Sequence, residues 1–454
     1  MMQETGYGVG KLLAPKSIAV VGVSGDAGKA GVTGATGIMA NLVKYGFTGH
    51  IYPINPKYDN ILGYKSYPDL ASVPEPVDML VIGIKSEQVL PVFKQAAEIG
   101  VGSCIIISSG FGEDKREDHR QMQKEMSRLS AESGMRICGP NCLGIINVHQ
   151  NIVAMSSVGL SAGPVNPGGV ALVTQSGALA SSFLAKAKDK GIGFSYVISS
   201  GNEADLDLAD YIRFLVDDPN TKAIAAYIEG MKDGERFKKA ASLCWGKNKP
   251  LVVFKVGRSE RGALTAQAHT GSITGSDQII DAMFEKYNVA RVGSVDDLLD
   301  VAQAFALQKV PCPGSRLGII TVSGGAGSIV SDISEDLGLE IPDLEAESIS
   351  RIGTILPSYT SVKNPVDTTA DILREPENLM KTAQALEADK NVDIIYFSLT
   401  AGSPEFMKKE ADIISRYGGQ AQKPVVVSWF SGNMNQEGMR TLQERGVPCF
   451  TSYE

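Results

Sequence analysis

The chain has 454 residues, of which 43% are hydrophobic and 21% are charged, and its formal net charge is −8. At about 150 residues per domain, this length predicts about three domains with full-sized cores, and the composition excludes disordered and membrane-embedded proteins. The negative charge and the lack of a Lys/Arg block argue against a nucleic-acid surface, because phosphate backbones require a basic stripe.

Short β-branched runs alternate with longer amphipathic stretches, which predicts an α/β fold with parallel sheets. The first unit has a strand at 17–23, a glycine-rich loop at 24–37 and a helix at 38–45. Further strands are predicted at 50–55, 77–84, 103–108 and 136–139. We interpret residues 1–148 as a Rossmann-like domain.

The loop after the first strand contains Gly22, Ser24 and Gly25. Its N–H groups and the following helix dipole could hold a pyrophosphate, although a bare tight turn explains it nearly as well. Lys57 follows the second strand, where an NAD-binding unit would have a carboxylate for the ribose hydroxyls. A cation there favours a 3′-phosphorylated nucleotide such as coenzyme A, and a solvated loop lysine is the equal alternative.

Two more loops reach the carboxyl edge of this sheet, where open α/β sheets bind ligands. One contains Ser108 and Ser109, and the other contains Asn141. Their small residues would allow an extended ligand such as pantetheine to lie against backbone, but a mere turn would explain the second loop equally. We interpret Cys142 as a packed thiol, because no histidine lies near it in sequence.

The rest of the chain contains a diverged internal repeat. Residues 170–178 resemble residues 318–326, because each run is a strand that leads into the small residues of a helix start. A proline-led strand follows in both copies, at 249–254 and 423–428. We predict two flavodoxin-like domains from this pattern. Their predicted bounds are 149–308 and 309–454.

The helix start in the first repeat has hydroxyl and amide groups, and it could bind phosphate through unpaired N–H groups and the helix dipole. Its residues are Thr174, Gln175, Ser176 and Gly177. Simple N-capping by Ser176 is the alternative. Glu229 follows another strand of this sheet, where a carboxylate could fix the tautomer of an imidazole, although an ordinary strand-end glutamate would look the same.

A segment rich in Gly, Ala, Ser and Thr, residues 257–275, separates the proline-led strand of the first repeat from the next helix. We interpret it as a long loop, and long loops are usually functional. It contains His269, Thr270 and Gly271, and the second repeat has no histidine. An imidazole can accept a phosphoryl group near neutral pH, but a lone histidine is more often structural.

The six cysteines form no Cys-x-x-Cys pair and mostly lie in apolar runs, which predicts buried free thiols in a reducing compartment. The N-terminus has no basic segment followed by an apolar stretch, and no apolar run approaches the ~18 residues of a membrane span. We therefore expect a cytoplasmic protein that does not bind membranes.

Four segments of the sequence together resemble the α-subunit portion of the NDP-forming acyl-CoA synthetases, which are relatives of succinyl-CoA synthetase. They are residues 170–178, Ser200-Gly201-Asn202, Glu229 and above all Gln267-Ala268-His269-Thr270-Gly271-Ser272. The resemblance covers essentially the whole chain and implies a coenzyme A-binding domain followed by two ligase domains. It implies that phosphate converts acyl-CoA to an acyl phosphate, that His269 takes the phosphoryl group, and that ADP or GDP receives it with Mg²⁺.

The resemblance also implies residue roles. Glu229 would orient His269, and phosphate would be bound at the helix start and beside the histidine, by Thr174, Gln175, Ser176, Gly177, Thr270 and Gly271. Coenzyme A and the acyl phosphate would contact Gly22, Ser24, Gly25, Lys57, Ser108, Ser109 and Asn141. No residue is expected to bind a metal ion.

The nucleotide site of this family belongs to an ATP-grasp domain, and nothing in the sequence resembles one. We therefore expect a β subunit or a fused C-terminal domain as the partner, and an oligomer. One alternative is a coenzyme A-binding regulatory module or scaffold, which the intact His269 and Glu229 disfavour. Another is an NAD(P)-dependent oxidoreductase, which Lys57 disfavours. The carboxylic acid and the choice between ADP and GDP remain open.

Overall fold

The computed structural model describes residues 4–25, 33–270, 276–369, 372 and 374–453. The chain divides into two compact units, residues 1–306 and 307–454. Each unit has its own sheets and its own hydrophobic cores. Among the described helices, none combines the length and the apolar character that crossing a bilayer requires.

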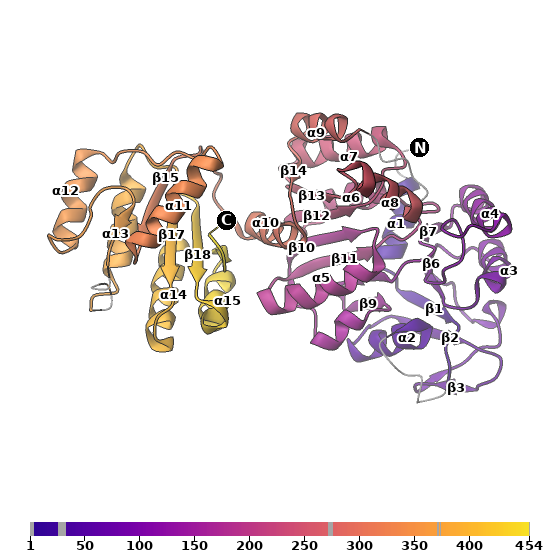
Figure 1. The fold of residues 1–454 in the computed structure, drawn as a ribbon. Coiled ribbons are helices and arrows are strands. Elements are labelled where there is room, and N and C mark those ends of the chain that lie inside the picture. Colours follow the sequence, from indigo (N-terminus) through magenta and orange to yellow (C-terminus); the bar gives the residue numbers. More distant parts are fainter. Residues whose placement is uncertain (1–3, 26–32, 271–275, 370–371, 373, 454) are drawn as a thin grey trace. The chain divides into compact units, whose positions relative to one another are not determined.

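A parallel sheet of five strands forms the N-terminal part of the first unit (Figure 1). In spatial order its strands are β2 (His50–Ile54), β1 (Ser17–Val21), β5 (Met79–Ile82), β6 (Ser103–Ile106) and β7 (Arg136–Cys138). Each strand lies inside its predicted range. The order 2-1-3-4-5 is that of flavodoxin-like doubly wound sheets. A short hairpin of β3 (Asn60–Ile61) and β4 (Tyr64–Lys65) follows β2.

Helices cover both faces of this sheet because each has one apolar stripe to bury. They are α1 (Glu4–Leu13), α2 (Gly34–Lys44), α3 (Ser86–Glu98) and α4 (Glu117–Ser133). Leu12 of α1 and Ile38 of α2 pack in one core with Ile18. Phe93 of α3 and Met126 of α4 belong to a separate core on the other face.

The second sheet of this unit has seven strands. In spatial order they are β14 (Ala290–Arg291), β13 (Leu251–Lys255), β12 (Ala223–Ile228), β10 (Pro167–Thr174), β11 (Phe194–Ser199), β8 (Gly144–Asn147) and β9 (Ile152–Met155). Strands β10 to β14 are parallel and repeat the 2-1-3-4-5 order, while β8 and β9 add an antiparallel edge. Strand β8 comes from the predicted N-terminal domain, and the division into three domains stays a prediction.

Helices also cover both faces of the second sheet (Figure 1). One face holds α6 (Leu208–Asp217), α7 (Gly234–Gly246) and α9 (Asp277–Lys286), and the other holds α5 (Gly177–Lys190) and α10 (Val295–Leu307). One hydrophobic core joins the two sheets, since Ile105 and Cys138 of the first sheet belong to the same cluster as Val173 and Ile198 of the second.

Helix α8 (Glu260–Thr270) occupies most of the segment that we interpreted as a long loop, so that interpretation was wrong. The segment is rich in Gly, Ser and Thr, which favour a loop. Its alanines, leucine and glutamate favour a helix and were given too little weight in the prediction. Ser259 also supports the helix start, since its hydroxyl accepts the N–H of Gly262 at 3.1 Å.

The second unit contains a single described sheet of five parallel strands with the same order. They are β16 (Val366–Asp367), β15 (Leu317–Thr321), β17 (Ile394–Thr400), β18 (Val425–Phe430) and β19 (Cys449–Phe450). The described helices are α11 (Gly324–Asp336), α12 (Ala346–Ile355), α13 (Asn378–Ala388), α14 (Pro404–Gly418) and α15 (Gln436–Glu444). The flavodoxin-like prediction for this part is confirmed.

The internal repeat extends to individual hydrogen bonds. The Thr174 hydroxyl accepts the N–H of Ser176, and the Thr321 hydroxyl accepts the N–H of Ser323, both at 3.1 Å. Each serine then caps the following helix. These contacts pair Thr174 with Thr321 and Ser176 with Ser323, which shifts the two compared sequence runs by one residue. Gln175 therefore corresponds to Val322.

Candidate active site

Doubly wound folds bind ligands where two neighbouring strands lead to helices on opposite faces. In the first sheet, β1 leads to α2 on one face and β5 leads to α3 on the other. In the second sheet, β10 and β12 lead to α5 and α7, also on opposite faces. We call the carboxyl ends of these strand pairs the first and the second switch point.

Bare backbone lines the first switch point. Gly22 follows β1 with φ +97°, a left-handed conformation that favours glycine, and a Cβ there would collide with the carbonyl oxygen of Gly83 after β5. Ser24 is half-buried, and its N–H donates to the Thr36 hydroxyl at 2.9 Å. The two strand ends can therefore approach closely and leave main-chain groups at the edge of the sheet.

Asn55 fixes the segment that carries Lys57. The Asn55 side chain donates to the Val23 carbonyl at 2.7 Å and accepts the N–H of Lys57 at 2.9 Å. Gly25 lies against the ring of Tyr58. The Lys57 side chain is exposed and forms no ion pair with any described residue. A cation with no carboxylate partner among the described residues fits an anionic ligand at this edge.

The loops after β6 and β7 also meet at this edge. Asn141 adopts φ +56°, and its N–H donates to the Ser108 carbonyl at 2.9 Å. The Asn141 side chain donates to Asn202 Oδ1 at 3.3 Å, so this loop contacts the loop after β11. The Ser108 hydroxyl donates to the Ile84 carbonyl, and Ser109 is exposed. Ser108 and Asn141 are thus in contact, as one ligand site would require.

Thr174, Ser176 and Gly177 form the helix start at the second switch point. Thr174 is fully buried, and Ser176 is the N-cap of α5, since its hydroxyl accepts the N–H of Leu179 at 3.4 Å. The N–H groups of Gly177 and Ala178 have no intrahelical acceptor, as in the first turn of any helix. The capping interpretation is therefore correct, and backbone donors remain for an anion.

The side-chain amide of Gln175 is engaged at all four positions. Its Oε1 accepts the N–H of Glu229 at 2.7 Å and the N–H of Gly230 at 3.0 Å. Its Nε2 donates to the Gly230 carbonyl at 2.8 Å and to Glu203 Oε2 at 3.1 Å. Every donor and acceptor of this amide is used within the protein, so Gln175 ties the end of β10 to the end of β12. Its contact with phosphate stays a prediction.

Glu229 is buried and is held from its other side by a lysine. Lys255, at the end of β13, is also buried, and its ammonium donates to the Glu229 carbonyl at 3.0 Å. Burial lowers the pKa of Lys255. The Glu229 peptide is thus fixed at its N–H by Gln175 and at its carbonyl by Lys255. A fixed backbone restricts where the Glu229 carboxylate can lie.

Glu203, which follows β11, was not predicted from the sequence. Glu203 is 4% exposed, and its carboxylate accepts the Ser200 hydroxyl at 2.8 Å in addition to the Gln175 amide. The Lys232 ammonium donates to the carbonyls of Asn202 and Glu203, both at 2.6 Å. The run Ser200-Gly201-Asn202-Glu203 after a strand was a signal that could have identified this residue.

Asn202 links Glu203 and its hydrogen-bond partners to the first sheet. Its side-chain Nδ2 donates to Gln123 at 3.0 Å and also to Glu113, whose other oxygen accepts the N–H of Gly110 at 2.6 Å. Its backbone N–H donates to the Pro140 carbonyl at 2.8 Å. Hydrogen bonds therefore connect loops at the carboxyl edges of both sheets.

His269 and its two neighbours are incompletely described. The backbone of His269 and Thr270 forms the last two residues of α8. The side chains of His269 and Thr270 and the whole of Gly271 lie outside the described residues. The roles of all three residues stay predictions.

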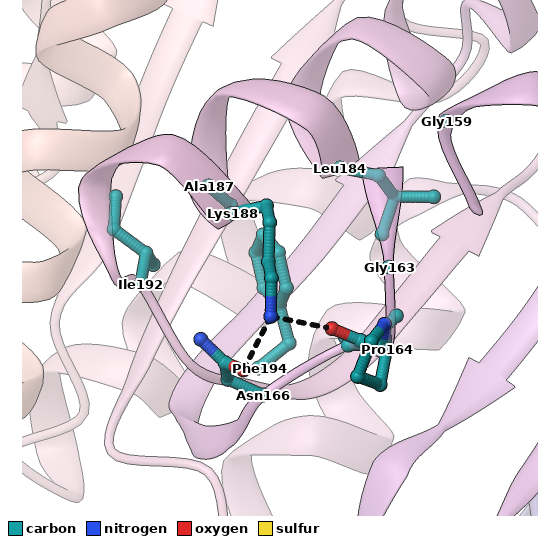
Figure 2. Close-up of a pocket in the computed structure, with 10 residues that line it drawn as sticks. Gly159, Gly163, Pro164, Asn166, Leu184, Ala187, Lys188, Ile192 and Phe194 are labelled. Carbon is teal, nitrogen blue, oxygen red and sulfur yellow. Dashed lines mark hydrogen bonds between the residues drawn. The ribbon is translucent and has the colours of Figure 1, made fainter. Parts of the chain in front are cut away.

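A small cavity lies apart from both switch points (Figure 2). It is lined by Asn166, Lys188 and Phe194, among others, and is about 10 Å³, enough for a single water molecule. Lys188 spans it, with its ammonium 3.4 Å from the carbonyl of Pro164 and from Asn166 Oδ1. Because Asn166 and Phe194 lie at the amino ends of β10 and β11, this cavity is at the edge opposite the candidate site.

Among the described residues, no cluster of His, Cys, Asp or Glu could hold a metal ion.

All six cysteines are free, as predicted, and five are buried. Cys138 and Cys142 have their sulfur atoms 4.0 Å apart. The contact with the Cys138 thiol and burial raise the pKa of Cys142 well above its ordinary value. A thiol that resists deprotonation is a poor nucleophile, which supports the interpretation of Cys142 as a packed residue.

Two family models match the chain. The model described as a CoA binding domain matches residues 16–148, and the one described as a succinyl-CoA ligase like flavodoxin domain matches residues 167–305. These matches contain the first and the second switch point, respectively.

Similar proteins cover almost the whole chain. The α subunit of acetate–CoA ligase [ADP-forming] II of Pyrococcus furiosus is 36% identical, over 96% of this chain and 93% of that subunit. The 4-hydroxybutyrate–CoA ligase [ADP-forming] of Nitrosopumilus maritimus is 32% identical over 98% of this chain, which spans 62% of that relative. A solved structure of acetyl-coenzyme A synthetase 1 of Ca. Korarchaeum cryptofilum, in complex with phosphate and ADP, has a TM-score of 0.87 at 33% identity. It covers 98% of this chain and 94% of that one.

Proposed function

We propose that this chain, which belongs to the NDP-forming acyl-CoA synthetase family, contributes the coenzyme A site and the phosphohistidine to an acid–thiol ligase. The overall reaction interconverts acyl-CoA, phosphate and ADP or GDP with a carboxylic acid, coenzyme A and the nucleoside triphosphate. The main support is that Gln175 and Glu229 join at the second switch point of the repeat that also contains His269.

The first step takes place between acyl-CoA and inorganic phosphate. A phosphate oxygen attacks the thioester carbonyl carbon, the C–S bond breaks, and the thiolate of coenzyme A leaves and takes up a proton. The N–H groups at the start of α5, near Gly177, would hold the phosphate, because a helix N-terminus favours an anion. The product is an acyl phosphate.

The second step moves the phosphoryl group to His269. A ring nitrogen of the neutral imidazole attacks phosphorus, the bond from phosphorus to the acyl oxygen breaks, and the carboxylate leaves. Glu229 would accept the other ring N–H and stabilise the positive charge that develops on the imidazole. The fixed backbone of Glu229 supports this role, since an orienting group must itself be held in place.

Coenzyme A would bind at the first switch point. Gly22 and Gly83 leave backbone accessible to an extended ligand, and Lys57 supplies a cation with no ionic partner among the described residues. Ser108 and Asn141 lie in loops that contact each other and the second sheet. This contact would bring the thioester toward the helix start that holds phosphate.

A partner with an ATP-grasp domain would complete the cycle. Phosphorylated His269 would deliver its phosphoryl group to ADP or GDP with Mg²⁺ there, and the P–N bond would break as the new P–O bond forms. The Nitrosopumilus relative, of which this chain spans 62%, supports a fused or separate partner. We also expect an oligomer and a cytoplasmic location.

Phosphohistidine formation tests this function directly. The chain is incubated with acyl-CoA and ³²P-phosphate, and acid-labile radioactivity on the protein is measured. We expect label on His269, and a His269→Asn variant that labels as well as the wild type would refute the proposal. Acetyl-CoA, 4-hydroxybutyryl-CoA and an aromatic acyl-CoA, assayed in parallel with and without an ATP-grasp partner, identify the acid.

A further inference from the structure

We propose that Glu203 is a positioning residue for phosphoryl transfer at the second switch point and that it acts through the side-chain amide of Gln175. The inference rests on the proposed function, because it assumes that phosphate reacts at the start of α5. Glu203 itself does not need to touch a substrate. Its carboxylate accepts the Gln175 amide, which in turn holds the peptide of Glu229.

The backbone of Glu203 indicates a functional constraint. Glu203 adopts φ +54°, in the left-handed region that side chains with a Cβ rarely adopt, and it is 4% exposed. A buried glutamate in a strained conformation is doubly unfavourable, and such residues concentrate at functional sites. The conformation aims the carboxylate at Ser200 and Gln175.

Glu203 is one of the four partners that fix the direction of the Gln175 amide. The two N–H groups of Glu229 and Gly230 require the amide oxygen on their side, and the Glu203 carboxylate requires the amide nitrogen on the other. Removing the carboxylate leaves one Nε2 hydrogen without an acceptor. Three contacts then hold the amide instead of four, so the support of the Glu229 peptide is weaker.

The charges around Glu203 come from three elements. The Lys232 ammonium, after β12, attracts the carboxylate, while Asp207, before α6, repels it. Arg236 of α7 pairs with Asp207 and so reduces that repulsion. Tyr211 of α6 is buried nearby and stays protonated, because burial raises its pKa well above the ordinary value.

A pH dependence follows from this environment. Burial is the main cause that raises the pKa of Glu203 to about 7. Protonation below that pH removes the charge-assisted bond to Gln175, and the Ser200 hydroxyl can rotate to accept the new proton. The transfer rate of the wild type should therefore fall as the pH drops through about 7.

Three variants test the proposal by single-turnover ³²P-labelling. We expect Glu203→Leu to lower the labelling rate about 100-fold with little change in the phosphate concentration at half-maximal rate, because the reacting groups are misplaced rather than removed. Glu203→Gln keeps both hydrogen bonds, so its rate should be near that of the wild type at pH 8. On the acid side, the wild type should lose rate more steeply than Glu203→Gln, because only the wild type has a carboxylate at this position to protonate. Glu410→Gln, at a buried glutamate of the second unit, is the matched control and should behave as the wild type.

A measurement that does not depend on labelling separates this proposal from the proposed function. Hydrogen–deuterium exchange at pH 8 should be faster in Glu203→Leu than in the wild type for the peptide that contains Glu229 and Gly230. If exchange increases but no protein ever labels, the proposed function fails and the positioning contact stands. Unchanged exchange or unchanged labelling in Glu203→Leu overturns the proposal. If that variant does not fold, equal acid slopes in the wild type and Glu203→Gln overturn it.

Discussion

Gln175 Oε1 accepts the peptide N–H of Glu229 at 2.7 Å, so the residue at a helix start holds the backbone of the residue at a neighbouring strand end. The second repeat keeps the same threonine and serine contacts around its own helix start. It has Val322 in place of Gln175 and Thr400 in place of Glu229. The repeats therefore share a structural frame, and the first alone adds the polar pair.

Replacing Gln175 should damage both stability and reaction. Gln175→Leu leaves the buried N–H groups of Glu229 and Gly230 without an acceptor, which should lower the free energy of unfolding by about 1–3 kcal/mol. His269 labelling should fall as well. Urea unfolding and single-turnover labelling measure the two effects. Val322→Leu is the matched control, and the idea fails if both variants label equally.

The two capping serines offer a second matched pair. Ser176→Ala and Ser323→Ala each remove an N-cap, so each should destabilise its own unit by about 1 kcal/mol. Ser176→Ala alone should also raise the KM for phosphate, because its helix start is the proposed anion site. Thermal unfolding and steady-state assays with the partner chain distinguish the effects. Equal phosphate KM values in the two variants would argue against that site.

Lys57 should discriminate between coenzyme A and its dephospho form. Lys57→Ala removes a cation proposed to contact the 3′-phosphate, so coenzyme A should bind about tenfold more weakly, which corresponds to about 1.4 kcal/mol. Binding of dephospho-coenzyme A should change little. Isothermal titration calorimetry measures both ligands. Lys363→Ala, an exposed lysine of the second unit, is the control, and a loss of affinity for both ligands would contradict the proposed contact.

Glu410 should make the second unit less stable as the pH rises. Burial raises the pKa of Glu410 to about 8, from an ordinary value of 4.5. Below pH 4.5 both the folded and the unfolded chain bind the proton, and between pH 4.5 and 8 only the folded chain does, so stability is lost over that window. Glu410→Gln should remove this slope and stabilise the unit at pH 8 by on the order of 4 kcal/mol. Denaturant unfolding at pH 5 and pH 8 measures the free energy of unfolding of the wild type and of Glu410→Gln. If that free energy changes equally with pH in the two proteins, the prediction is wrong.

Most of the fold could be predicted from the sequence, because buried parallel strands can be recognised as short runs of β-branched residues. All five predicted strands of the first sheet, including Met79–Ile82, are present. Strand β8 was missed, since Gly144–Asn147 is short and directly follows a glycine-rich loop. Helix α8 was missed because loop-forming residues are mixed with helix-forming ones around Glu260.

The candidate site was harder to predict than the fold. Gln175 and Glu229 were identified, but their contact joins residues 54 positions apart, and sequence spacing does not reveal which atoms meet. Glu203 was missed because its importance comes from burial and from a left-handed backbone, which depend on tertiary packing. The direction of the Gln175 amide likewise follows from four partners that no local pattern contains.

The pairing of strand β8 has a practical consequence for dissecting the protein. A fragment that ends at residue 148 would retain Gly144–Asn147 but lose both neighbours of that strand, β9 and β11. Its exposed edge would then be free to recruit strands from other molecules and precipitate. A cut after Ala306 interrupts no described sheet, so that position is the better end point for expressing the first unit separately.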